Sequence, residues 1–135
     1  MNGRFQIATH IMTLLSSAGG EVLSSEYIAG SVNINPVLIR KELSNLIQHG
    51  LVVSKEGKSG GYTLAKPAAQ ITLADVYSAV QTKSVLGKAR NTPNPKCPVG
   101  KQINQHLNQL NSEIELSIIN QLAQQSIAEF TQQFK

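Results

Sequence analysis

The sequence predicts a mainly α-helical fold that carries one two-stranded β-hairpin and ends in a long helix. Three observations support this prediction. Apolar residues recur at helical spacing near the start of the chain. A glycine-rich segment, 56–61, separates two short runs of strand-forming residues. Beyond Pro98, apolar residues return every three or four positions as far as Leu122.

The N-terminal segment predicts two helices. The first runs from residue 4 to about residue 18, because its apolar residues share one side, and Gly19-Gly20 ends it. The second begins at Ser24 or Ser25, whose hydroxyl can accept a hydrogen bond from a free backbone amide. It is short, because Asn33, which tolerates a left-handed backbone, interrupts it.

The third helix has one apolar face and one polar, basic face. Asn35 followed by Pro36 is typical of a helix N-cap and first turn, and the helix is expected to run to Gly50. At about 100° per residue, the two faces separate clearly. The core-facing set is Ile39, Leu43, Leu46 and Ile47, and the outward set is Val37, Arg40, Lys41, Ser44 and Gln48.

Two strand candidates, 51–55 and 62–65, flank the glycine-rich turn. Within the turn, Gly57-Lys58-Ser59 matches the end of a nucleotide-binding P-loop. That motif also needs a glycine five residues earlier and a helix directly after the serine. Position 52 is valine and strand-forming residues follow, so we reject nucleotide binding and interpret the turn as the tip of a β-hairpin.

The C-terminal part predicts a helix capped by Thr72, a proline-containing basic loop at 82–97, and the long helix. The long helix would measure about 36 Å, and the small domain before it cannot cover its apolar stripe. A second subunit is the expected cover, and 127–134 predicts a short final helix that folds back. The predicted dimerisation residues are Val99, Ile103, Leu107, Leu110, Ile114, Ile118 and Leu122.

The charge of the chain is unevenly distributed. The net charge is +4, yet residues 40–101 hold ten basic against three acidic side chains. Residues 102–135 hold one basic side chain against three acidic ones. Basic charge gathered in one region suits a polyanion such as nucleic acid. The single cysteine, Cys97, excludes an internal disulfide and fits a cytoplasmic location. We expect no secretory signal and no membrane-spanning segment.

The order helix, short helix, tight turn, helix and two-stranded hairpin is that of a winged helix-turn-helix. In this arrangement the helix from Asn35 enters the major groove of double-stranded DNA. Arg40 is the main candidate for reading guanine, because its guanidinium can bond O6 and N7 together. The accessory DNA-binding candidates are Ser25, Asn35, Val37, Lys41 and Ser44 in the helices, and Lys58, Ser59, Gly60 and Tyr62 in the wing. An ordinary surface helix with a solvated basic face remains the alternative.

The segment from Ser24 to Val80 resembles the DNA-binding half of the bacterial regulators typified by IscR, NsrR and CymR, the Rrf2 family. The resemblance rests on Ile34-Asn35-Pro36, Arg40-Lys41, Gly50-Leu51-Val52, the Gly60-Gly61-Tyr62 wing and the helix from 71 to 80. "NPKCPVGK", 94–101, is most similar to the branch represented by YwnA. The resemblance implies a dimeric transcriptional regulator, most often a repressor, whose recognition helix and wing, 35–49 and 55–62, clasp a palindromic operator.

The predicted domains are a winged helix-turn-helix domain, 1–81, a basic loop, 82–97, and a dimerisation helix with a short C-terminal helix, 98–135. In the family that this chain resembles, members that hold an iron–sulfur cluster use three cysteines in the loop before the long helix. Cys97 stands alone there, so we expect no cluster and no other cofactor. His10, His49 and His106 show no zinc-ligand spacing with it, so no metal is expected.

Cys97 is nevertheless a candidate sensor thiol, because a helix start beside Lys96 favours the reactive thiolate. The alternative is a small residue packed under the loop. An enzyme is not expected, because His106 would lie about 13 Å along the helix from Cys97, too far to activate it. The remaining functional alternative is a protein-binding adaptor with vestigial DNA binding, and the sequence identifies no effector.

Overall fold

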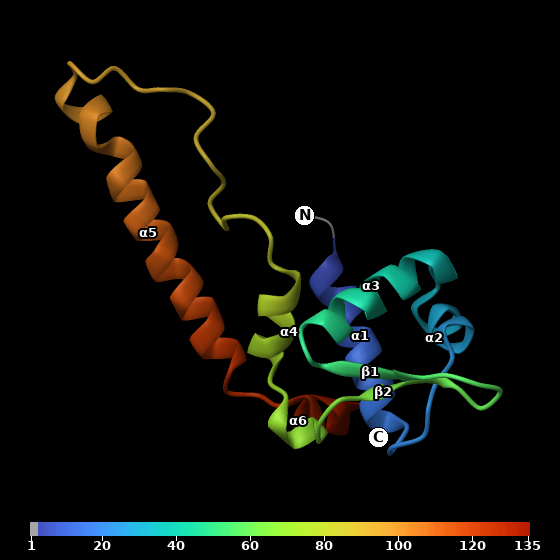
Figure 1. Ribbon diagram of the computed structural model, residues 1–135. Coiled ribbons are helices and arrows are strands. Elements are labelled where there is room, and N and C mark those ends of the chain that lie inside the picture. The colour runs from blue at the N-terminus through green and yellow to red at the C-terminus, as the bar shows by residue number, and fades with distance from the viewer. Residues whose placement is uncertain (1–2) are drawn as a thin grey trace.

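Helix α1 (Arg4–Ser17) lies at the centre of the body of the molecule in the computed structural model, which describes residues 3–135 (Figure 1). It contacts α2 (Ser25–Val32), α3 (Pro36–Gln48), α4 (Leu73–Val80) and α6 (Ile127–Thr131), as well as the hairpin. Together with α1, these elements form the body. Its side chains Ala8, Ile11, Met12 and Leu15 are almost completely buried. The apolar spacing of the sequence therefore places α1 as the inner helix of an aliphatic core.

Helices α2 and α3 form the helix-turn-helix. The Ser24 hydroxyl caps α2 by accepting a hydrogen bond from the Tyr27 amide at 3.1 Å. Asn33 ends α2 in the left-handed conformation, with φ at 63°. The Asn35 side chain then caps α3 by accepting from the Val37 amide at 2.8 Å. Local capping chemistry thus fixes both sides of the tight turn.

The buried face of α3 is narrower than its sequence predicts. Ile39, Leu43 and Leu46 are fully buried, as expected. Ile47 was expected beside them but is 36% exposed, so that prediction is wrong. Its side chain lies about 100° around the helix from Leu46, at the edge of the buried stripe and close to the C-terminal end of α3.

The wing is the antiparallel pair β1 (Val52–Lys55) and β2 (Gly61–Leu64). Val52 pairs with Leu64, and Lys55 pairs with Gly61 at the turn. Strand β1 begins one residue later than predicted, and β2 begins and ends one residue earlier than predicted. Backbone hydrogen bonds of 2.8 and 3.0 Å between Leu23 and Tyr62 also attach β2 to the segment before α2.

The C-terminal end of the chain returns to the body. The short 3₁₀ helix η1 (Ala68–Gln70) leads into α4. At the N-terminus of α4, the side chains of Thr72 and Asp75 each accept a hydrogen bond from the backbone N–H of the other residue. Helix α6 packs against α1, Ile127 is fully buried, and its amide donates to the Ile71 carbonyl at 2.7 Å. A final 3₁₀ turn, η2 (Gln132–Phe134), ends the chain. The expected final helix therefore packs against the first predicted domain, and the domain division itself stays a prediction.

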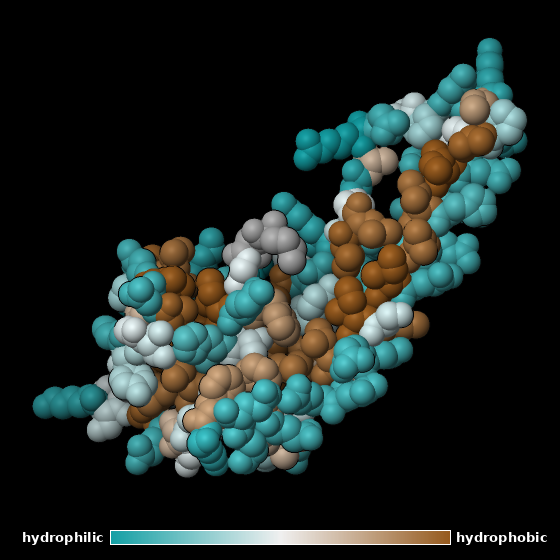
Figure 2. Space-filling model, turned by 180° about the vertical axis from the view of Figure 1, so that it is seen from behind, coloured by the Kyte–Doolittle hydropathy of each residue, from teal (hydrophilic) through white to brown (hydrophobic). Residues whose placement is uncertain are grey.

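Helix α5 (Pro98–Leu122) extends away from the body, with α4 as its main neighbour (Figure 1). None of its residues is buried, and Figure 2 shows apolar side chains running along it. The loop before it is attached to it at two points. The Val85 amide donates to Glu115 Oε1 at 3.2 Å, and the Leu86 amide donates to Asn111 Oδ1 at 2.9 Å.

The predicted fold is confirmed: the chain is mainly helical, with a two-stranded wing and a long C-terminal helix. Across residues 3–135, no helix has the length and apolar character needed to cross a membrane.

Candidate nucleic-acid interface

The outer face of α3 presents exposed side chains of mixed chemistry. Val37, Arg40, Lys41 and Ser44 are all exposed, and Asn35 stands at the N-terminus as the cap. The structure thus brings together five of the predicted DNA contacts at one end and one side of a single helix. A face with a guanidinium, an ammonium, a hydroxyl and apolar groups can offer both hydrogen bonds and methyl contacts to base edges.

Two exposed large side chains of the helix-turn-helix were missed from the sequence. Leu38 is 52% exposed and follows Val37, which is 60% exposed, in the first turn of α3. Tyr27, in the first turn of α2, is 61% exposed. Position in the first turn of each helix of the predicted helix-turn-helix was the signal that could have identified both residues.

Arg40 is linked to α2 through Ser25. Its Nη1 donates to Ser25 Oγ at 3.4 Å, and the same hydroxyl donates to Glu26 Oε2 at 2.9 Å. Ser25 is only 6% exposed, so its hydroxyl lies behind the surface that Arg40 presents. The role of Ser25 as a direct DNA contact stays a prediction, and the structure gives its hydroxyl two side-chain partners.

A hollow of about 520 Å³ lies beside this face, between α3 and the start of α1. Arg4 donates from Nε to Glu42 Oε2 at 3.0 Å across it and forms an ion pair. Lys41 and Ser44 are also in its lining. The ion pair offsets the one acidic side chain of α3, so the basic character of the helix is retained.

The wing presents Lys58 and Ser59 at an exposed tip. Two of its glycines are required by the hairpin itself. A Cβ on Gly60 would lie 2.3 Å from the Lys55 carbonyl oxygen, and one on Gly61 would lie 2.6 Å from the Leu23 carbonyl oxygen. No side chain fits at either position without moving backbone. Gly60 and Gly61 therefore allow the close backbone contacts of the wing, and Lys58 and Ser59 are the side chains exposed at its tip.

Tyr62 is partly buried against the core rather than fully presented to solvent. Its backbone holds β2 to Leu23, as described above. This placement makes Tyr62 an anchor of the wing, and its predicted contact with DNA stays a prediction.

Cys97 is an exposed residue at the N-cap of α5. Its thiol makes no capping hydrogen bond, but the backbone N–H groups of Gly100 and Val99 favour the thiolate and lower the pKa of Cys97. His106 lies further along the helix, with Nε2 3.4 Å from Gln102 Oε1. The chemistry available here is that of an accessible thiol without a neighbouring base.

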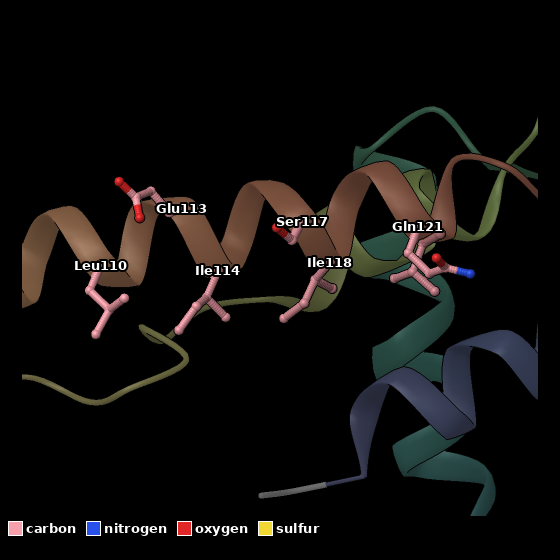
Figure 3. Close-up of a pocket in the computed structure, with 7 residues that line it drawn as sticks. Leu110, Glu113, Ile114, Ser117, Ile118 and Gln121 are labelled. Carbon is pink, nitrogen blue, oxygen red and sulfur yellow. The ribbon is translucent and has the colours of Figure 1, made fainter.

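The apolar side of α5 forms an open groove of about 530 Å³. Figure 3 shows Leu110, Ile114 and Ile118 pointing to the same side of the helix. The rest of the lining is Glu113, Ser117, Gln121 and Leu122. Leu107 and Leu110 are each 46% exposed, and Val99 is 67% exposed. The stripe that the sequence predicts thus lies along one side of α5, where each of its residues is exposed or half-buried.

Comparisons with known proteins agree with this geometry. A model of the Rrf2 family, described as an iron-dependent transcriptional regulator, matches residues 1–133. YwnA of Bacillus subtilis, which is named as an HTH-type transcriptional regulator, is 40% identical over 94% of this chain and 93% of its own length.

Solved structures give the same result. A crystal structure described as that of a DNA-binding protein is 36% identical, covers 94% of this chain and 97% of its own, and superposes with a TM-score of 0.75. CymR, the global cysteine regulator of B. subtilis, is 19% identical, with coverage of 98% and 95% and a TM-score of 0.69, which supports the fold alone.

The iron dependence in the family description does not fit the donor atoms of this chain. Cys97 is its single cysteine, whereas an iron–sulfur cluster is ordinarily held by about four thiolate or imidazole ligands. In the part of the chain that the structure describes, no group of three or more His, Cys, Asp or Glu side chains could hold a metal ion. The residues present are instead those of a helix-turn-helix, a wing and one exposed thiol.

Proposed function

The chain belongs to the Rrf2 family of transcriptional regulators, which bind DNA and are not enzymes, and from this premise we propose that it is a homodimeric repressor. It acts in the cytoplasm on a palindromic operator. Helix α3 reads base edges in the major groove, and the wing contacts the phosphate backbone or the minor groove beside it. Residues 1–81 form the DNA-binding domain, 82–97 the connecting loop, and 98–135 the segment that contains the dimerisation helix.

The observation that carries this proposal is the exposed outer face of α3. Val37, Arg40, Lys41 and Ser44 are exposed there while the opposite face is fully buried. Arg40 is the side chain best suited to read a guanine, and the other three contribute accessory contacts. No observation on the described residues favours a protein-binding adaptor over this function.

Selection of bound genomic DNA fragments tests the proposal directly. The purified full-length chain should enrich a palindrome whose half-sites are about one helical turn, ~34 Å, apart. Affinity should fall steeply with salt, because phosphate contacts release counterions. A lack of any enriched sequence at physiological salt would contradict sequence-specific regulation. A reporter gene placed behind the selected operator should be expressed more strongly when the regulator is deleted, and weaker expression would contradict repression.

The apolar stripe of α5 supports the homodimer. Leu110, Ile114 and Ile118 project from one side of a helix in which no residue is buried. Two such helices packed against each other would cover both stripes and hold two α3 helices about a two-fold axis. Sedimentation of the free protein should give twice the mass of one chain.

Cys97 supports a response to thiol-reactive signals. It is exposed, and its pKa is lowered by the N–H groups of Gly100 and Val99. With hydrogen peroxide, the Cys97 thiols of two subunits would lose two protons and two electrons to form one disulfide, and the peroxide would become two waters. Operator binding by the wild type and Cys97→Ser should respond differently to peroxide. An identical response of both proteins would remove the sensor role.

A further inference from the structure

A chain of hydrogen bonds joins the first turn of α2 to the main base-reading candidate on α3. Arg40 Nη1 donates to Ser25 Oγ at 3.4 Å, and Ser25 Oγ donates to Glu26 Oε2 at 2.9 Å. Ser25 is buried, whereas Glu26 and Arg40 are exposed. A buried hydroxyl therefore connects two exposed groups of opposite charge that belong to two different helices.

The direction of these hydrogen bonds is set by the chemistry of the groups. A serine hydroxyl has one proton to donate, and a guanidinium can only donate. The proton of Ser25 therefore points to the Glu26 carboxylate, and a lone pair of its oxygen faces Arg40. Because the hydroxyl donates to a charged acceptor, its oxygen becomes a stronger acceptor for the guanidinium.

Glu26 is held in its ionised form. It lies in the first turn of α2, where free backbone amides favour negative charge. Its own backbone N–H, then the Ser25 hydroxyl and the charge of Arg40 lower the pKa of Glu26. At neutral pH the link thus ends in a carboxylate.

We propose that Glu26, acting through Ser25, is a positioning residue that directs Arg40 to a base and away from the phosphate backbone. This inference rests on the proposed DNA-binding function. An exposed arginine beside DNA is attracted to any phosphate, and that attraction carries no sequence information. Attachment of the guanidinium to Ser25 limits its orientations, and the Glu26 charge weakens non-specific binding by repelling nearby phosphates. Specificity rises because the unwanted contact is disfavoured.

The test uses the full-length protein, its selected operator, and a set of operators that each carry one changed base pair. Affinities are measured by fluorescence anisotropy over a range of salt concentrations. Glu26→Gln keeps the shape of the side chain and removes its charge. Glu21→Gln is the matched control, because Glu21 is an exposed carboxylate just before α2 and outside the link. Thermal melting checks that each variant is folded.

Glu26→Gln should bind the intact operator as tightly as the wild type or a few-fold more tightly, with a steeper dependence on salt. Its discrimination should fall about tenfold at one base pair of each half-site, the one that Arg40 reads. Ser25→Ala should lose discrimination at the same base pair, while Glu21→Gln should keep the wild-type profile. In an Arg40→Ala background, Glu26→Gln should change discrimination no further, because the two residues act as one unit.

Two results would overturn the inference. In the first, Glu26→Gln keeps wild-type discrimination at every base pair. In the second, Glu26→Gln loses discrimination equally at all base pairs. The second result would mean that Glu26 only stabilises the fold. Failure of the proposed function would give a different result, because the wild type itself would then bind all the operators equally. In that case both proposals would be contradicted.

Discussion

The body and helix α5 differ in how far their apolar side chains are buried. In the body, Ile11, Leu43 and Ile71 are completely buried by neighbouring helices. In α5, no residue is buried, and the apolar stripe is open along one side. In the helices of both regions, apolar residues recur every three or four positions. Periodicity therefore identifies the face of a helix that must be covered, while the number of neighbouring elements in the same chain decides whether that chain can cover it.

Leu43→Ala is the sharpest test of the body. The side chain is fully buried in α3, so its truncation leaves a cavity and should lower the free energy of unfolding by about 2–5 kcal/mol. Chemical denaturation with circular dichroism measures the change. The loss should be the same at low and high protein concentration, because the contacts lie within one chain. A loss that grows on dilution would contradict the self-contained body.

Ile114→Ser makes the corresponding change on α5. The side chain lies in the middle of the open stripe, where burial by a partner would contribute about 1.5–3 kcal/mol. The dissociation constant of the proposed dimer should therefore rise about tenfold or more, as measured by sedimentation equilibrium. Gln105→Glu is the control, because this exposed residue lies on the opposite side of the helix. Equal effects of the two changes would show that the stripe is not the interface.

Local features of the fold could be predicted from the sequence, whereas long-range contacts could not. The caps at Asn35 and Thr72 are local, so residue type and spacing were sufficient to predict them, and for α2 they left a choice between Ser24 and Ser25. The contact between Ile71 and Ile127 joins residues far apart in the chain, and no local pattern signals it. Helix α6 was expected to fold back, but its place against α1 depends on this long-range pairing.

The candidate site shows the same division. Helical spacing was enough to predict the outer face of α3, including Arg40, because exposure follows from the opposite buried face. The Ser25 link to Arg40 was not predictable, since it depends on how two helices pack across the turn. The close approach of Leu23 to Gly61 was missed for the same reason, although the glycine-rich hairpin itself was predicted.

Lys58→Ala tests whether the wing contacts DNA together with the helix-turn-helix of the body. The side chain is exposed at the tip of the hairpin, away from the core. If it contacts phosphate, its loss should weaken binding to all DNA sequences alike and lower the salt slope by about 1. Titrations of operator and unrelated DNA at several salt concentrations measure both effects. A loss confined to the operator would instead assign Lys58 to base reading, and an unchanged slope would leave the wing tip outside the interface.

The smallest expected effect concerns Cys97, at the point where the loop passes into α5. The backbone N–H groups of Gly100 and Val99 lower its pKa, so the thiolate persists to lower pH than in an unfolded chain. The rate of alkylation by iodoacetamide should therefore reach half its maximum at a lower pH in the folded protein than in the same protein in urea. These N–H groups belong to the first turn of α5, which the Lys101 amide closes by donating to the Cys97 carbonyl at 2.8 Å. Since that turn is local, Ile114→Ser should keep the lowered midpoint even when its dimer dissociates. A midpoint that returned to the unfolded value in this variant would show that the start of α5, like its apolar stripe, depends on a second subunit.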